Sequence, residues 1–292
     1  MIPKEFDYVA PASIQEALAA LRDGGDDAKV LAGGHSLIPL MKLRLAAPSR
    51  LVDLRNIADL RGLRRAPNSE VVVGSMVTYS DLQSIEPLKA FPLLGECAAA
   101  IGDAQVRARG TIGGSLAHAD PASDLPAAAL ALDAVLVVSH LNGSISEREI
   151  AARDFFVDLL TTALEPGEIL TGVRLAMPQG KAGSAYVKIR NKASHYALAG
   201  VAAVLRVGDD GVCQDAAIAL TGVASKPFRV ERAESVLRGS TLEDSAVREA
   251  ANAAGSADVQ WMSDLFGSEE YRKHLAGVVT SRAIEAARGR VR

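Results

Sequence analysis

Apolar side chains in the N-terminal segment switch between helical and strand-like spacing. Residues 14–21 place Ile, Ala and Leu at helical intervals, which predicts an amphipathic helix. Residues 29–32 and residues 50–54 are short apolar runs of the length expected for strands. Ser36 lies between these two strands, where it can cap a second helix. A strand, a glycine turn, a helix and a strand form a βαβ unit, and the first turn of such a unit often binds phosphate.

The middle of the chain contains several apolar strand patterns separated by turn residues. The expected strands are residues 62–66, 70–75, 134–139, 144–150 and 169–175, and the main expected helices are residues 88–101, 125–132 and 155–163. Asn142-Gly143 is a typical two-residue hairpin turn, so the third and fourth of these strands should be antiparallel neighbours. Met177-Pro178-Gln179-Gly180 is expected to mark a domain boundary.

The last part of the chain has three apolar segments followed by three amphipathic ones. The expected strands are residues 184–190, 198–207 and 216–223, and the expected helices are residues 229–237, 242–254 and 269–288. The run 198–205 fits a helix as well as a strand, because an unbroken apolar run has no diagnostic period. The whole pattern indicates an α+β protein.

Composition places the chain among globular proteins and offers little metal chemistry. Of its 292 residues 49% are hydrophobic and 23% are charged, and the formal net charge of −3 gives no reason to expect nucleic acid as a partner. Cys97 and Cys213 belong to no C-x-x-C pattern, which argues against an iron–sulfur or zinc site in this chain. The N-terminus lacks the apolar core of a signal peptide, and the apolar run 125–138 is too short for a bilayer, so we expect a cytoplasmic protein.

Two double-glycine motifs are the candidate ligand-binding segments. They are Ala32-Gly33-Gly34-His35-Ser36-Leu37 and Thr111-Ile112-Gly113-Gly114-Ser115. Glycine lets the main chain approach a ligand closely, and successive N–H groups in such a turn can bind anionic oxygens. Neither motif is a G-x-G-x-x-G or Walker A sequence, and a tight turn without a ligand would also explain Gly33-Gly34.

The second motif continues into Ser123 and Asp124, which can bond the hydroxyl groups of a ribose or ribityl chain. Alternatively, one of these two residues only caps the helix expected at 125–132. The five histidines are dispersed without metal-ligand spacing. Ser36 lacks the G-x-S-x-G setting of a hydrolase nucleophile. We therefore predict no catalytic residue and no metal ligand, and expect a bound cofactor to carry any chemistry.

Several motifs in this order resemble one family, the flavoprotein (medium) subunits of the molybdenum hydroxylases, and most closely those of aerobic carbon monoxide dehydrogenase. The family pattern A-G-G-[QH]-S-L matches residues 32–37, and V-R-x-R-G followed by T-I-G-G-[NS] matches residues 106–115. A-D-P-x-[AS]-D matches residues 119–124, and further family segments follow at 167–170, 186–188 and 267–272. The resemblance covers nearly the whole chain.

This resemblance implies a two-part FAD-binding domain followed by a C-terminal domain. Residues 1–55 would form a small βαβ-type subdomain, residues 56–177 a larger subdomain with a mixed or antiparallel sheet, and residues 178–292 a three-stranded sheet with helices. The resemblance also implies a large molybdenum-cofactor subunit and a small subunit with [2Fe–2S] clusters as partners, in a dimer of heterotrimers. Electrons would pass from the clusters through FAD to an external acceptor, and the complex could associate peripherally with a membrane.

Family positions assign FAD contacts to named residues of this chain. The pyrophosphate would be held by Gly33, Gly34, Ser36, Thr111, Gly113 and Gly114, and lined by Ala32, His35, Leu37, Ile112 and Ser115. The ribityl or ribose hydroxyls would meet Ser123 and Asp124. The isoalloxazine would lie beside Leu170 and Lys188, and Tyr196 would cover the ring. Two departures from the family pattern are Ser115 in place of the commoner Asn and the residues 191–195 before Tyr196.

Two other functions fit the same residues. A self-contained flavin oxidase or dehydrogenase would need its own substrate pocket and catalytic base, and residues 178–292 show no obvious cluster for one. A non-catalytic scaffold would have kept the fold and lost the flavin. The substrate of the complex would bind on another chain, and carbon monoxide, a purine, an aldehyde and an N-heterocycle are all compatible. The electron acceptor is equally open between a quinone, oxygen and NAD.

Overall fold

Four β-sheets contain the strands of the computed structural model, which describes residues 2–291. The strands are β1 (Asp7–Val9), β2 (Ala28–Leu31), β3 (Arg50–Asp53), β4 (Leu63–Ala66), β5 (Glu70–Gly74), β6 (Val135–Asn142), β7 (Ser144–Ala151), β8 (Phe156–Asp158), β9 (Thr161–Thr162), β10 (Ile169–Ala176), β11 (Lys181–Arg190), β12 (Ala197–Val207), β13 (Cys213–Thr221) and β14 (Phe228–Arg229). The helices are α1 (Ile14–Asp23), α2 (Leu37–Lys42), α3 (Tyr79–Ser84), α4 (Pro92–Ala100), α5 (Ala104–Arg109), α6 (Ile112–His118), α7 (Leu125–Ala131), α8 (Ala152–Phe155), α9 (Glu231–Leu237), α10 (Asp244–Gly255) and α11 (Glu269–Arg288).

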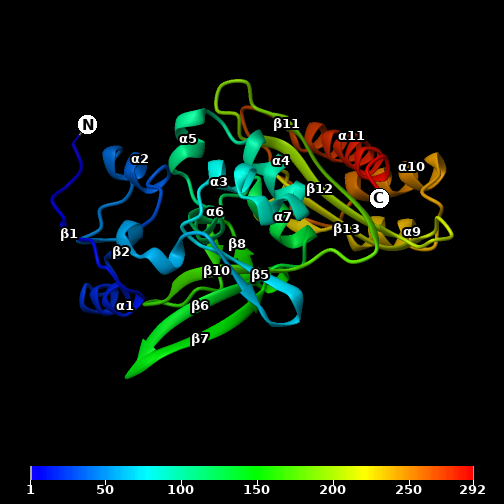
Figure 1. Cartoon of the computed structure of the whole chain (residues 1–292). Helices are drawn as coiled ribbons and strands as arrows, with labels where there is room; N and C mark the ends of the chain where they lie inside the picture. The colour runs from blue at the N-terminus through cyan, green and yellow to red at the C-terminus, as the bar shows by residue number, and fades with distance from the viewer. Residues whose placement is uncertain (1, 292) are drawn as a thin grey trace.

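The N-terminal part is a small parallel sheet in the order β1-β3-β2 (Figure 1). The predicted βαβ unit is present as β2, α2 and β3, and β1 is an additional edge strand. Helix α1 begins where the Ser13 hydroxyl accepts a hydrogen bond from the Glu16 amide. It buries Leu18 in a core that also contains Val52, so the apolar stripe read in the sequence is the packed face.

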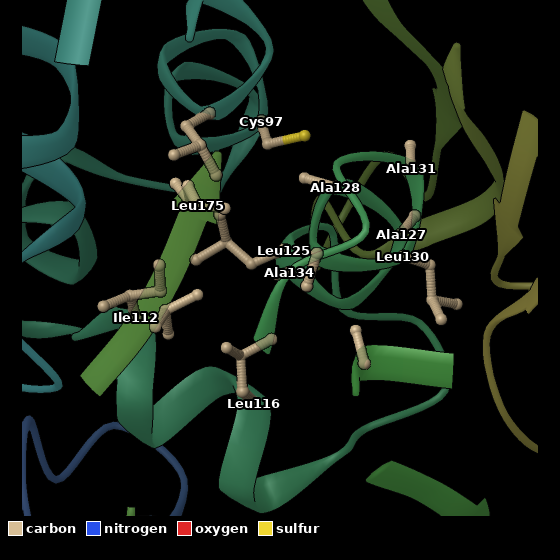
Figure 2. Packing of buried hydrophobic residues seen from close by; sticks show 14 of the residues in the cluster. Cys97, Ile112, Leu116, Leu125, Ala127, Ala128, Leu130, Ala131, Ala134 and Leu175 are labelled. Atoms are coloured by element: carbon tan, nitrogen blue, oxygen red, sulfur yellow. The ribbon is translucent and has the colours of Figure 1, made fainter. Parts of the chain in front are cut away.

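The middle part is an antiparallel sheet in the order β4-β5-β10-β6-β7. The buried side chains of its strands, such as Leu136 and Leu175, share one core with helices α4, α6 and α7. Figure 2 shows Leu175 of the sheet together with Ile112 and Leu116 of α6 and with the alanines of α7. The β6–β7 hairpin turns at Gly143, whose φ is +74°, and it extends past the helices on the α1 side of the molecule (Figure 1).

The C-terminal sheet has the order β11-β12-β13-β14 and is covered on both faces. Helix α11 contacts β11 and β12, whereas α7 of the preceding part contacts β12 and β13. Ala202 and Ala219 accordingly belong to the core of the middle part, while Val201 and Ile218 belong to the C-terminal core. A strand buried on both faces is apolar throughout, which explains why the run 198–205 has no period. The expected three strands are joined by a two-residue fourth strand, β14.

The helix expected at residues 155–163 is wrong. The short α8 ends at Phe155, and the chain continues as the small β8–β9 sheet. Phe155 and Phe156 are both buried and pack edge to face with ring centroids 5.3 Å apart. Consecutive side chains of an extended chain point to opposite sides, and the chain changes from helix to strand between these two rings.

Two expected helix caps are also absent. Ser36 precedes α2 and Asp124 precedes α7, but neither side chain bonds to its helix. Ser123, the other candidate cap for α7, bonds to Ser115 instead. The Ser36 and Asp124 side chains are therefore not used by the helices that follow them, and the Ser123 hydroxyl contacts another segment.

Candidate functional site

A cavity of about 1140 Å³ lies between the small parallel sheet and the five-stranded sheet. Ligand pockets commonly span roughly 300–1,000 Å³, so the space is sufficient for a dinucleotide. The predicted site residues that line it are Ala32, Gly33, Gly34, His35, Ser36, Leu37, Thr111, Gly113, Gly114, Ser115 and Leu170. The fold thus brings both glycine motifs and the start of β10 to one cavity.

The loop between β2 and α2 offers backbone donors to this cavity. The N–H groups of Gly33, Gly34, His35 and Ser36 donate to no protein acceptor within residues 2–291. Gly34 has φ +79°, a conformation that a residue with a Cβ rarely adopts. A Cβ on Gly33 would lie 2.3 Å from the Arg109 carbonyl oxygen. Consecutive unpaired amides of this kind form a concave site for anionic oxygens.

The second motif has a different geometry from the expected turn. Gly113 and Gly114 lie in the first turn of α6, and the Thr111 hydroxyl caps this helix by accepting from the Gly114 amide at 3.1 Å. The Gly113 amide donates to the Ser75 carbonyl at 2.9 Å, and the Ile112 amide is also bonded. The amides of residues 112–115 are therefore used within the protein. Its glycines serve close approach, since a Cβ on Gly113 would lie 2.4 Å from that of Ser75.

A hydroxyl pair connects the second motif to the segment that follows it. The Ser115 and Ser123 hydroxyl oxygens are 2.8 Å apart, within hydrogen-bonding distance. Ser115 lines the cavity, whereas Ser123 does not. Ile112 points into the core instead of the cavity and is 1% exposed. Ser123 thus contacts the cavity lining through Ser115, and Ile112 belongs to the core.

Asp124 and Lys188 form a buried ion pair. The Lys188 Nζ lies 2.8 and 2.9 Å from the two carboxylate oxygens and donates a third bond to the His195 carbonyl. The Tyr186 hydroxyl donates to the same carboxylate. Burial raises the pKa of Asp124, and the Lys188 charge acts against this shift. Neither residue lines the cavity, so two groups assigned to FAD by family position are engaged with each other.

Tyr196 is 45% exposed and does not line the cavity, so its assignment as a cover for the ring stays a prediction. Burial raises the pKa of Tyr79 to about 12, and this side chain does line the cavity. Sequence reasoning missed Tyr79 and also Ser75, which precedes it at the end of β5. Neither belongs to a motif, and no local pattern points to them.

Within residues 2–291 no group of three or more His, Cys, Asp and Glu side chains is placed to hold a metal ion. No helix in the same part of the chain is both long enough and apolar enough to cross a bilayer.

Known proteins match the chain along its length. Residues 4–178 match the family model described as the FAD binding domain in molybdopterin dehydrogenase, and residues 184–287 match the CO dehydrogenase flavoprotein C-terminal domain. The carbon monoxide dehydrogenase medium chain of Afipia carboxidovorans is 44% identical over 293 residues, which cover 100% of both chains. A chain of the reconstituted CO dehydrogenase from Oligotropha carboxidovorans superposes with a TM-score of 0.94 at 43% identity, over 99% of this chain and 100% of that one. A chain of quinoline 2-oxidoreductase from Pseudomonas putida 86 gives a TM-score of 0.90 at 35% identity, over 99% of each.

Proposed function

Because the chain belongs to the FAD-binding medium subunits of the molybdenum hydroxylases, we propose that it passes electrons through FAD from a partner's [2Fe–2S] cluster to an external acceptor. The observation that carries this proposal is the unpaired amide run Gly33 to Ser36, facing a cavity of dinucleotide size. FAD, when bound, supplies the redox chemistry, since it can exchange electrons singly or in pairs. The chain's own residues bind and orient it.

Each wall of the cavity has a separate task in this proposal. The amides of Gly33, Gly34, His35 and Ser36 would hold the pyrophosphate, as donors aimed at an anion do at other glycine loops. The first turn of α6 would form the opposite wall, with Gly114 leaving room for the ligand. Leu170 would give an apolar contact for the ring. The Asp124–Lys188 pair would hold the wall behind Ser115 in place.

The proposed partners are a large molybdenum-cofactor subunit and a small [2Fe–2S] subunit, assembled as a dimer of heterotrimers. The support is that similar chains are named medium chains or subunits, among them the carbon monoxide dehydrogenase medium chain and a subunit of 6-hydroxypseudooxynicotine dehydrogenase of Paenarthrobacter nicotinovorans. We place the complex in the cytoplasm, where it could reach a membrane-bound acceptor peripherally.

The test is purification of the chain with its accompanying subunits and measurement of flavin, molybdenum and iron. We expect a yellow flavin spectrum with both metals in the complex. Gly34→Asp should lose most of the FAD, because it places a negative charge at the amide run, and Gly34→Asn should lose less. Gly180→Asp is the matched control, since Gly180 also has a positive φ and lies in an open turn.

Three outcomes would contradict the proposal. Absence of flavin from the wild-type complex would favour a scaffold that has lost the cofactor. A flavin-containing chain that purifies alone and turns over a substrate without molybdenum or iron would be a self-contained dehydrogenase. Equal FAD content in Gly34→Asp and Gly180→Asp would remove the first loop from the binding site.

A further inference from the structure

Ser75 occupies a junction between the two sides of the cavity. It follows β5, its amide donates to the Thr171 carbonyl at 3.1 Å, and its carbonyl accepts from the Gly113 amide at 2.9 Å. These bonds place the residue between the first turn of α6 and the start of β10, where Leu170 lies. The backbone of Ser75 is therefore fixed on both sides, whereas its hydroxyl is held by no hydrogen bond.

The hydroxyl of Ser75 is buried without a protein partner. The residue is 3% exposed, and its Oγ makes no hydrogen bond to the protein. Leaving a buried hydroxyl unpaired costs roughly 1–3 kcal/mol, so such groups usually have a partner from outside the chain. Ser75 also lines the cavity, so rotation about its Cα–Cβ bond is the movement that brings this buried hydroxyl to a ligand.

Other buried polar atoms without partners do not have this combination. Thr280 Oγ1 lies in α11 within the C-terminal part, away from the cavity lining. His140 lines the cavity, but its ring is already bonded through Nε2 to Ser146, and the residue is only half-buried. In the described chain, residues 2–291, Ser75 is the residue that combines a buried hydroxyl without a protein partner with a place in the cavity lining.

We propose that Ser75 Oγ donates a hydrogen bond to bound FAD, at an oxygen of the stretch that joins the pyrophosphate to the ring system. This inference rests on the proposed function and adds a residue to it. The position between Gly113 and Leu170 selects that stretch, because family position assigns Gly113 to the neighbourhood of the phosphates and Leu170 to the ring. The acceptor is a phosphate oxygen or a ribityl hydroxyl, which offer the same chemistry to a serine donor.

The test compares Ser75→Ala with wild type in the full-length chain and its accompanying subunits, after FAD is removed and titrated back. A single lost hydrogen bond should weaken FAD binding roughly three- to thirtyfold, depending on whether the acceptor is charged. The FAD-free variant should melt at the same temperature as FAD-free wild type or higher, because the unpaired hydroxyl has been removed. Ser80→Ala, five positions along and exposed, is the matched control and should change neither value.

Titration with ADP distinguishes the two acceptors. If the partner is a phosphate oxygen, Ser75→Ala should weaken ADP binding as well as FAD binding, whereas a ribityl partner leaves ADP unaffected. Unchanged FAD affinity in Ser75→Ala would overturn the inference and leave the proposed function intact. A lower melting temperature of the FAD-free variant with no additional effect on binding would assign Ser75 a purely structural role. A wild-type complex that binds no FAD would remove the proposed function and this inference together.

Discussion

Two glycines of the site are placed where backbones touch. Gly33 lies against the Arg109 carbonyl, which joins the N-terminal loop to the end of α5, and Gly113 lies against Ser75, which joins α6 to β5. A methyl group in either place would overlap main-chain atoms, which cannot rotate away as a flexible side chain can. The motifs therefore hold the walls of the cavity together as well as leaving room for a ligand.

Gly33→Ala should weaken both the fold and FAD binding. Its Cβ would lie 2.3 Å from the Arg109 carbonyl oxygen, so one of the two segments must shift. Overpacking of this kind costs about 1–3 kcal/mol, which urea denaturation of the FAD-free protein can measure. Gly102→Ala is the control, since a Cβ there meets open space. Equal stability of the two variants would show that the loop tolerates displacement.

Lys188→Met should destabilise the chain in a pH-dependent way. The Lys188 and Asp124 side chains are 5% and 6% exposed, and removing one partner of a buried pair costs about 3–5 kcal/mol. Burial already raises the pKa of Asp124 in the folded state. A carboxyl with a raised folded pKa contributes stability below its unfolded pKa and loses it as the pH rises through the folded value. Without the cation this pKa rises further. The stability that Lys188→Met loses relative to wild type should therefore become smaller as the pH is lowered.

Thermal melts between pH 5 and 8 measure that deficit. Asp124→Asn combined with Lys188→Met should recover part of the stability at neutral pH, because no unpaired charge remains buried. Lys181→Met is the control, since Lys181 and Asp209 form an exposed pair at 2.9 Å and such pairs contribute about 0–1 kcal/mol. A deficit of equal size at both ends of the pH range would mean that the buried carboxylate is not its source.

At the scale of elements, the short helix α6 determines how the cavity is built. It contacts β10 of the sheet, α7 behind it and β9 beside it. Its first turn is covered by its own cap and by the chain around Ser75, so its amides are occupied. The two glycine motifs look alike in sequence but differ in role, since the first offers amides and the second offers a closely packed wall.

Thr111→Ala tests this role of α6. Loss of a helix N-cap costs about 0.5–2 kcal/mol, and here the loosened turn faces the cavity, so FAD affinity should fall together with stability. Ser268→Ala removes the equivalent cap of α11, whose hydroxyl accepts from the Tyr271 amide. That variant should lose similar stability and keep its FAD affinity. Loss of FAD affinity in both variants would indicate a general effect of instability.

The elements predicted from sequence are those with a local signal. The βαβ unit, the hairpin at Asn142-Gly143 and the helix at 269–288 are present because periodicity and turn chemistry act within a few residues. The helix at 155–163 fails because both Phe155 and Phe156 are buried by distant parts of the chain. The residues of the site also divide into those with a local sequence signal and those without one. The glycine motifs can be read locally, whereas Ser75 acquires its role only through its contact with Gly113.

At the scale of the whole molecule, the cavity separates two parts that share few contacts. The small core of the parallel sheet takes Met76 and Ile169 from the middle part, and α1 contacts the five-stranded sheet at β6. The C-terminal sheet, by contrast, is packed directly against α7 of the middle part. A ligand bound between the first two parts would add contacts where the protein provides fewest. Binding should therefore stabilise the N-terminal part more than the C-terminal one.

Hydrogen exchange with and without FAD tests this arrangement amide by amide. The amides of Gly33 to Ser36 have no protein acceptor in the described chain, so they should exchange quickly without FAD and slow markedly when its phosphates accept their hydrogen bonds. The amides of Ile112 and Gly113 are already bonded to Val77 and Ser75, so their exchange should be slow in both states. Gly143 at the hairpin turn is the internal control and should not respond. Protection by FAD at Gly113 with none at Gly33 to Ser36 would reverse the roles assigned to the two motifs.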